Sequence, residues 1–200
     1  MTEFKLYDYQ ENLVDQARHI LLKKSGVLIQ SPPGSGKSVM IAEVVKNAVN
    51  KGSHILFIVH RKELSYQIEN TLKKHGVDLT HVDILSEKRA KNILSELTPP
   101  KLIVTDETHH SRAKTYKDIY DYFPNVLRVG FTATPWRANG KGFTDIYDEM
   151  VKGPTVEWLI NNHKLADYDY KSVVLVDESK LKKSSTGDYT KQSMDKAIPK

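Results

Sequence analysis

The chain has 200 residues, of which 39% are hydrophobic, and a formal net charge of +5. That length suits one domain, or one domain with a small appendage, and is enough to bury a substantial core. The absence of cysteine excludes disulfides, zinc ribbons and cysteine nucleophiles, and favours a reducing cytoplasm. The basic excess is modest and both signs are interspersed, so charge alone is weak evidence for a polyanionic partner.

Apolar β-type runs alternate with helical patterns along the chain. A helix is expected over residues 13–21, followed by a strand at 27–30, a helix at 39–49, a strand at 55–59 and a helix at 64–72. Further strands are expected at 102–105 and 126–131, with 173–176 as a later candidate. This alternation predicts an α/β fold with a mainly parallel sheet and helices on both faces. In such folds ligands bind at the carboxyl ends of the strands.

The first candidate site is QSPPGSGKS, residues 30–38, directly after the first expected strand. Its glycines allow close approach of a phosphate chain, the following helix adds its positive end, Lys37 reaches the terminal phosphates, and Ser38 holds magnesium. The strict pattern wants glycine where this chain has Ser31, so a plain strand-to-helix turn is the alternative. The strand–loop–helix context favours phosphate binding, and with it a P-loop NTPase fold.

The second candidate site follows the strand expected at 102–105. Asp106 and Glu107 stand at its end, 69 residues after Lys37. Beside a bound triphosphate, Asp106 can hold magnesium and Glu107 can polarise the attacking water. An acidic pair at a strand end is common by chance, and a helix cap is the alternative interpretation. The presence of the phosphate-loop motif in the same chain favours the catalytic interpretation of this acidic pair.

Composition also allows predictions about membrane association and about the C-terminal segment. The longest purely apolar run, 55–59, is too short to span a bilayer, and the first residues lack a signal-peptide core. We therefore expect a cytoplasmic protein with no membrane partner. From about Asp177 the chain has few large apolar residues and many lysines, serines and threonines, which indicates a linker or loose tail.

With GSGKS at 34–38 and DETH at 106–109, the chain resembles superfamily 2 helicases and translocases of the DEAD/DEAH-box type, in their phage and prophage form. The resemblance runs from about residue 6 to 170. It implies a RecA-like ATP-binding lobe at 1–170, with 171–200 as a linker or tail toward a second lobe, and a bacterial or phage-infected cell. The cofactors implied are ATP and Mg²⁺. The implied ATP-binding residues are Gln10, Pro33, Gly34, Ser35, Gly36, Lys37 and Ser38.

Other segments add roles by the same resemblance. LYDYQ, residues 6–10, stands just upstream of the first expected helix and is similar to the Q motif, which makes Gln10 the partner of adenine. Residues 55–67 are similar to motif Ia, where Arg61 and Lys62 would bind nucleic-acid phosphates. GFTATPWR, residues 130–137, is similar to motif III. The residues implied to couple hydrolysis to movement are His109, Thr132 and Thr134.

The function implied is a helicase or translocase lobe that hydrolyses ATP and binds nucleic acid, with DNA favoured over RNA. Related proteins carry a second lobe whose arginines close over the phosphates, and no such lobe is present within these residues. We therefore expect weak hydrolysis by this chain without a second lobe or partner protein. A nucleotide-dependent binding module without motor activity is the alternative, and a small P-loop kinase is a third reading that residues 130–137 disfavour.

Overall fold

The structure is a computed structural model of the whole chain. It describes residues 5–59, 63–108, 113–134, 142–168, 178–183 and 189–197. None of the helices in these segments is long and apolar enough to cross a membrane.

A six-stranded sheet forms the centre of the fold, in the order β3-β2-β4-β5-β1-β6. All of its strand pairs are parallel. The strands are β1 (Gly26–Gln30), β2 (Ile55–Val59), β3 (Val82–Ser86), β4 (Leu102–Thr105), β5 (Leu127–Thr132) and β6 (Glu149–Lys152). The four strands expected before residue 135 are confirmed, and so is the parallel α/β fold. The candidate strand at 173–176 lies outside the described residues.

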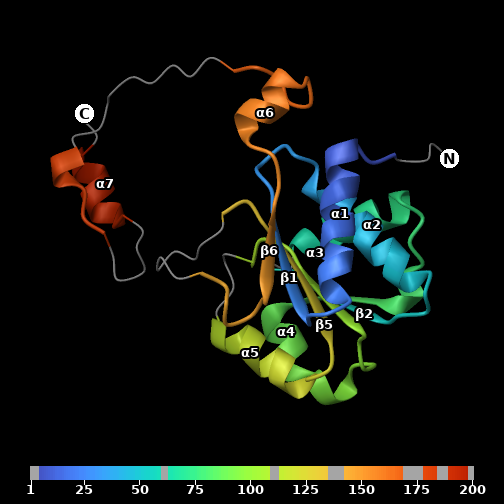
Figure 1. Ribbon diagram of the computed structural model, residues 1–200. Helices are drawn as coiled ribbons and strands as arrows, with labels where there is room; N and C mark the ends of the chain where they lie inside the picture. The colour runs from blue at the N-terminus through green and yellow to red at the C-terminus, as the bar shows by residue number, and fades with distance from the viewer. Residues whose placement is uncertain are drawn as a thin grey trace.

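Two helical layers cover the sheet, one on each face (Figure 1). One layer consists of α1 (Asp8–Leu21), α2 (Lys37–Val49) and α3 (Glu63–Lys74), which pack on alternate residues of the strands, such as Val27 and Phe57. The other contains α4 (Glu87–Asn92) and α5 (Ala113–Tyr122), which pack on the intervening residues, such as Leu28 and Leu56. Both faces of the central strands are therefore buried, and no residue of β2 is more than 1% exposed.

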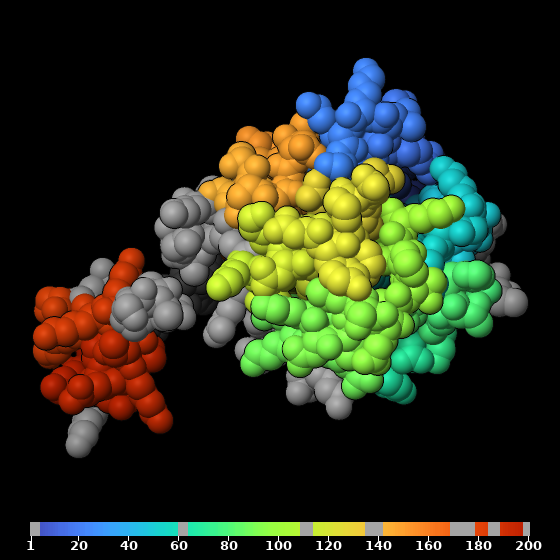
Figure 2. Space-filling model, turned by 90° about the horizontal axis from the view of Figure 1, so that it is seen from below, coloured from blue at the N-terminus to red at the C-terminus, as the bar shows by residue number. Residues whose placement is uncertain are grey.

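The remaining elements are short. They are η1 (Leu79–His81), η2 (Leu94–Glu96), α6 (Val156–Asn161), η4 (Glu178–Lys180) and α7 (Lys191–Ala197). In the segment expected to be a linker or tail, η4 packs with α7, and the Thr190 amide donates to the Lys182 carbonyl oxygen at 2.9 Å. This small unit stands apart from the sheet (Figures 1 and 2). The proposed boundary near residue 170 lies outside the described residues and stays a prediction.

The first helix starts earlier than expected. Residues 6–10 were expected just upstream of it, but α1 begins at Asp8, so Gln10 lies in its first turn. The Gln10 side-chain oxygen accepts a hydrogen bond from the Tyr7 amide at 2.9 Å, which satisfies a donor at the helix start. The apolar pattern alone did not show this cap.

Gly130 provides a test of the core on the α5 face. A Cβ built at Gly130 would collide with the Tyr147 ring and hydroxyl and would lie 2.9 Å from Leu28 Cδ1. We expect Gly130→Ala to lower the free energy of unfolding by about 1–3 kcal/mol, because a buried site with no room must strain its neighbours. Chemical denaturation measures the loss. Gly142→Ala is the matched control, since nothing lies within 4 Å of its Cβ position. Equal stability of the two variants would contradict this packing.

Candidate nucleotide-binding site

The loop between β1 and α2 has the backbone of a phosphate cradle. Gly34 and Gly36 have φ angles of +77° and +78°, in the left-handed region that favours glycine. Gly36 is also the N-cap residue of α2 and offers no capping side chain, so the first amides of the helix remain open to a ligand. Pro33 and Ser38 lie exposed on this loop and at the start of the helix.

Two buried serines hold the loop together from inside. Ser31 Oγ donates to Ser35 Oγ at 2.7 Å, and Ser35 Oγ donates to the Pro32 carbonyl oxygen at 2.6 Å. Both serines are fully buried. Ser31, which departs from the strict glycine pattern, therefore anchors the loop. The sequence did not reveal this role, because it depends on a contact within the folded turn.

The start of α1 supports the same loop from outside. Gln10 Nε2 and the Tyr9 hydroxyl both donate to the Ser35 carbonyl oxygen, at 2.9 and 2.7 Å. Gln10 is only 4% exposed, and its amide oxygen is bonded to the Tyr7 amide. A Cβ on Gly36 would collide with Gln10 Nε2. Gln10 thus lies against the phosphate loop with both ends of its amide bonded within the protein.

Lys37 points into the loop that it follows. Its Nζ donates to the carbonyl oxygens of Ser31 and Pro32 at 3.3 and 3.4 Å, and lies 3.9 Å from Glu107 Oε1. The sheet therefore brings the phosphate loop and the acidic pair together, although 69 residues separate them in sequence. The Lys37 ammonium group thus lies next to both the phosphate loop and the Glu107 carboxylate.

The acidic pair occupies a constrained turn after β4. Glu107 has a φ angle of +47°, which is uncommon for a residue with a side chain, and its amide donates to Asp106 Oδ1 at 2.9 Å. Burial and, to a smaller extent, the nearby Glu107 charge raise the pKa of Asp106 to about 6, against the opposing effects of the Glu107 amide and Lys37. Near neutral pH, ionised Asp106 is a buried charge that an added cation would stabilise.

Thr132, the last residue of β5, and Thr134 form a turn at the end of this strand. Thr132 Oγ1 donates to the Thr134 carbonyl oxygen at 2.8 Å and accepts from the Thr134 amide at 3.1 Å. Thr108 connects the acidic loop to β5, because its Oγ1 donates to the Phe131 carbonyl oxygen at 3.2 Å. Sequence reasoning did not single out Thr108. His109, Arg61 and Lys62 lie outside the described residues.

Magnesium would have few protein ligands here. The described residues include no group of three or more His, Asp or Glu side chains that could hold a metal ion. Mg²⁺ commonly takes one or two protein ligands and fills its octahedron with phosphate oxygens and water. The Ser38 hydroxyl, at the start of α2, and the Asp106 carboxylate fit that limited role.

A glycine cradle, an acidic pair and a threonine turn at one edge of a parallel sheet define a P-loop NTPase of the RecA-like class, in the form of a superfamily 2 helicase lobe. The chain belongs to the family described as "Type III restriction enzyme, res subunit", whose profile matches residues 3–98 and 77–137.

Individual relatives agree with the family. The chain is 56% identical over 173 residues to a "51.5 kDa protein" of a Lactococcus phage, covering 86% of this chain and 38% of that one. It is 25% identical over 217 residues to the "Putative ATP-dependent helicase IRC3" of Saccharomyces cerevisiae, covering 92% and 31%. The chain thus spans about a third of the length of these relatives, and the phage-type resemblance is confirmed.

The solved structure of the "ATP-dependent Type ISP restriction-modification enzyme LlaBIII bound to DNA" has a similar fold. Its TM-score is 0.60 at 17% identity, and the match covers 82% of this chain and 16% of that one. At this identity the similarity supports the fold alone.

The raised pKa of Asp106 predicts how the free energy of unfolding depends on pH. Its carboxyl is protonated in both folded and unfolded protein below pH 3.8, and the folded state bears the cost of ionisation above about pH 6. The contribution of Asp106 to stability therefore falls as pH rises through that window. We expect Asp106→Asn to stabilise the nucleotide-free protein by about 1–3 kcal/mol at pH 7, and by much less at pH 4.

Thermal and denaturant unfolding at the two pH values measure this effect. Asp121→Asn is the control, because Asp121 lies on the surface, paired with Lys117 in an exposed i,i+4 ion pair. Unchanged or reduced stability of Asp106→Asn at pH 7 would contradict the burial argument.

Proposed function

We propose that this chain is the ATP-binding lobe of an ATP-dependent helicase or translocase, and that it binds and hydrolyses ATP in a manner coupled to nucleic acid. The observation that carries the proposal is the position of Lys37 Nζ, which contacts the phosphate loop and lies 3.9 Å from Glu107. Phosphoryl transfer to water needs a cradle, a cation and a group that orients the water, and these three meet at one point.

The residues present fit Mg·ATP. The amides from Gly34 to Ser38 would bind the phosphates together with Lys37, while Ser38 and Asp106 would hold the magnesium ion. A magnesium ion held by these residues would supply Lewis-acid stabilisation of the negative charge that develops on the phosphates. Glu107, whose carboxylate lies next to Lys37, would orient the attacking water and accept its proton.

Nucleic acid is the proposed partner, with DNA favoured over RNA. The family name refers to a restriction enzyme, and LlaBIII is described as ATP-dependent and bound to DNA. Arg61 and Lys62 would bind the nucleic-acid backbone. His109, Thr132 and Thr134 would couple hydrolysis to movement. Thr108 would also take part in this coupling, because its bond to β5 connects the acidic loop to the threonine turn.

A second lobe is the other proposed partner. Residues 1–170 would form the first lobe and residues 171–200 would lead toward the second. An arginine reaching the phosphates from that lobe accelerates turnover by orders of magnitude in such enzymes, so we expect this chain to bind ATP better than it hydrolyses it. A nucleotide-dependent binding module without motor activity is the alternative that turnover measurements test.

The first test is ATP binding and hydrolysis with and without single-stranded DNA. We expect Mg·ATP binding by the chain, weakened about tenfold or more by Lys37→Ala, because the cation facing the phosphates is lost. Glu107→Gln should bind ATP normally but lose about 100-fold in turnover, because it removes the proton acceptor. Calorimetry and a phosphate-release assay measure the two quantities.

Lys73→Ala is the control for Lys37, since Lys73 pairs with Glu69 on the surface of α3. Absence of ATP binding by the unchanged chain would overturn the proposed function. Binding with negligible turnover, even with DNA and a supplied second lobe, would favour the binding module.

The role of Gln10 can be tested with two nucleotides. Its contact with the Ser35 carbonyl oxygen supports the loop whatever base is bound. We therefore expect Gln10→Ala to weaken ATP and GTP binding by similar factors of about 3–10, the scale of a lost buried hydrogen bond. Glu11→Ala, an exposed change on the same helix, is the control. Loss of ATP binding alone would instead support adenine recognition.

A further inference from the structure

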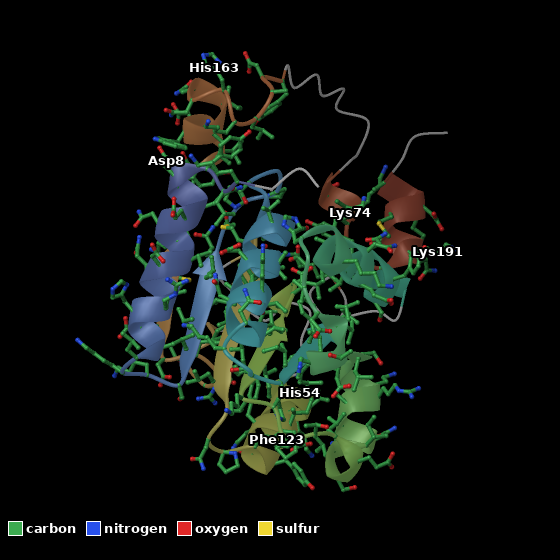
Figure 3. The ribbon with its side chains drawn as sticks, turned by 90° about the vertical axis from the view of Figure 1, so that its right-hand side faces the viewer. Asp8, His54, Lys74, Phe123, His163 and Lys191 are labelled. Atoms are coloured by element: carbon green, nitrogen blue, oxygen red, sulfur yellow. The ribbon has the colours of Figure 1, made fainter. Side chains whose placement is uncertain are left out.

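One segment outside the sequence motifs contacts the phosphate loop. Residues 153–168, here called the strap, leave the end of β6 and carry α6. The Gly153 amide donates to the Gln30 carbonyl oxygen at 2.7 Å, and a Cβ at Gly153 would lie 2.9 Å from Ser31 Oγ. The strap therefore starts in tight contact with the first residues of the loop. In Figure 3 its His163 lies at the same end of the molecule as Asp8, opposite His54 and Phe123.

The turn after α6 has a defined shape. Thr155 caps the helix through a bond from the Trp158 amide, and a left-handed residue, His163, with a φ angle of +55°, follows its C-cap. The amides of Lys164 and Leu165 then both donate to the Leu159 carbonyl oxygen, at 2.8 and 3.1 Å. Leu159 is fully buried, so the backbone that carries Leu165 is anchored to the protein interior.

Leu165 lies directly on the first glycine of the cradle. Its Cδ1 is 2.6 Å from the position that a Cβ on Gly34 would occupy. The leucine thus fills the side of the loop where a side chain at position 34 would stand. Because glycine moves readily between left- and right-handed conformations, a packed neighbour favours the conformation that it fits.

Aromatic contacts fix the strap to α1 beside this point. Trp158 meets the Tyr9 ring edge-on at 5.7 Å, and Lys164 Nζ lies 4.0 Å from the centroid of the Tyr7 ring. Tyr9 in turn donates to the Ser35 carbonyl oxygen. Besides the contact at Gly153, the strap therefore reaches the phosphate loop directly through Leu165 and indirectly through Tyr9.

We propose that Leu165 is a positioning residue for nucleotide phosphates, which acts by holding Gly34 in its left-handed conformation. This inference depends on the proposed function, since it concerns the same phosphate loop. A loop that is ordered before the ligand arrives loses less conformational entropy on binding. Leu165 would act on every nucleotide in the same way, because the contact that it makes is with Gly34 of the phosphate loop.

The test compares Leu165→Ala with Leu165→Met in the full chain. For Leu165→Ala we expect Kd for Mg·ATP and Mg·ADP to rise by a similar factor of about 5–20, with kcat at saturating ATP within about twofold of the unchanged chain. Methionine keeps an apolar chain of similar volume and should restore Kd to within about threefold. Leu22→Ala is the control, because Leu22 is 76% exposed at the end of α1.

A second pair of variants tests the contact itself. Gly34→Ala should weaken binding, partly through backbone strain and partly through its collision with Leu165. Adding Leu165→Ala removes this collision, so the loss of affinity in the double variant should be smaller than the sum of the two single losses. Additive losses in the double variant would mean that the two positions do not interact.

The outcomes distinguish this inference from the proposed function. If the unchanged chain binds ATP and Lys37→Ala does not, the nucleotide site stands. In that case, unaltered or tighter binding by Leu165→Ala would overturn the strap inference alone. A fall in kcat without a change in Kd would also overturn it, because loop order acts on binding. Calorimetry gives Kd directly, and unfolding without nucleotide confirms that each variant is folded.

Discussion

Parallel hydrogen bonding among β1, β4 and β5 decides where the phosphate loop, the acidic pair and the threonine turn lie. Gln30, the last residue of β1, pairs with Thr132 of β5, and Thr105, the last residue of β4, pairs with Gly130. All three strands therefore end at one edge of the sheet, and the residues that follow each strand emerge there. The cradle, the acidic pair and the threonine turn occupy neighbouring positions because the strands share a direction. An antiparallel neighbour would move one group to the far edge.

The same arrangement places two like charges, Asp106 and Glu107, next to each other at the end of β4. Two adjacent carboxylates stand at a buried strand end, and Lys37 is the nearby cation, shared with the loop carbonyls. Burial and like charge together favour the protonated form of Asp106. The raised pKa of Asp106 means that added positive charge, such as a metal ion, would stabilise its ionised form. If Asp106 holds magnesium as proposed, stability and function oppose each other at this position.

Much of this organisation could be predicted from sequence, for identifiable reasons. Interior strands such as β2 are apolar throughout, because both faces are buried, and they stand out as continuous runs. The edge strands β3 and β6 were missed. All of β3 is half-buried and β6 buries only Val151, so neither shows an unbroken apolar run. Chemically distinctive residues such as Lys37 and Glu107 could also be found, because their motifs are local.

Contacts between distant segments could not be predicted, and they explain how a glycine-rich loop stays ordered. Such a loop has few side chains of its own with which to fix its backbone. Its support comes from Ser31 within, from Gln10 before it in the chain and from Leu165 far beyond it. Leu165 belongs to no motif, while Gln10 and Ser31 stand out in sequence for other reasons, Gln10 as part of a segment similar to the Q motif and Ser31 as a departure from the glycine pattern. The loop chemistry is thus local, while its conformation depends on three separate segments that only the fold brings together.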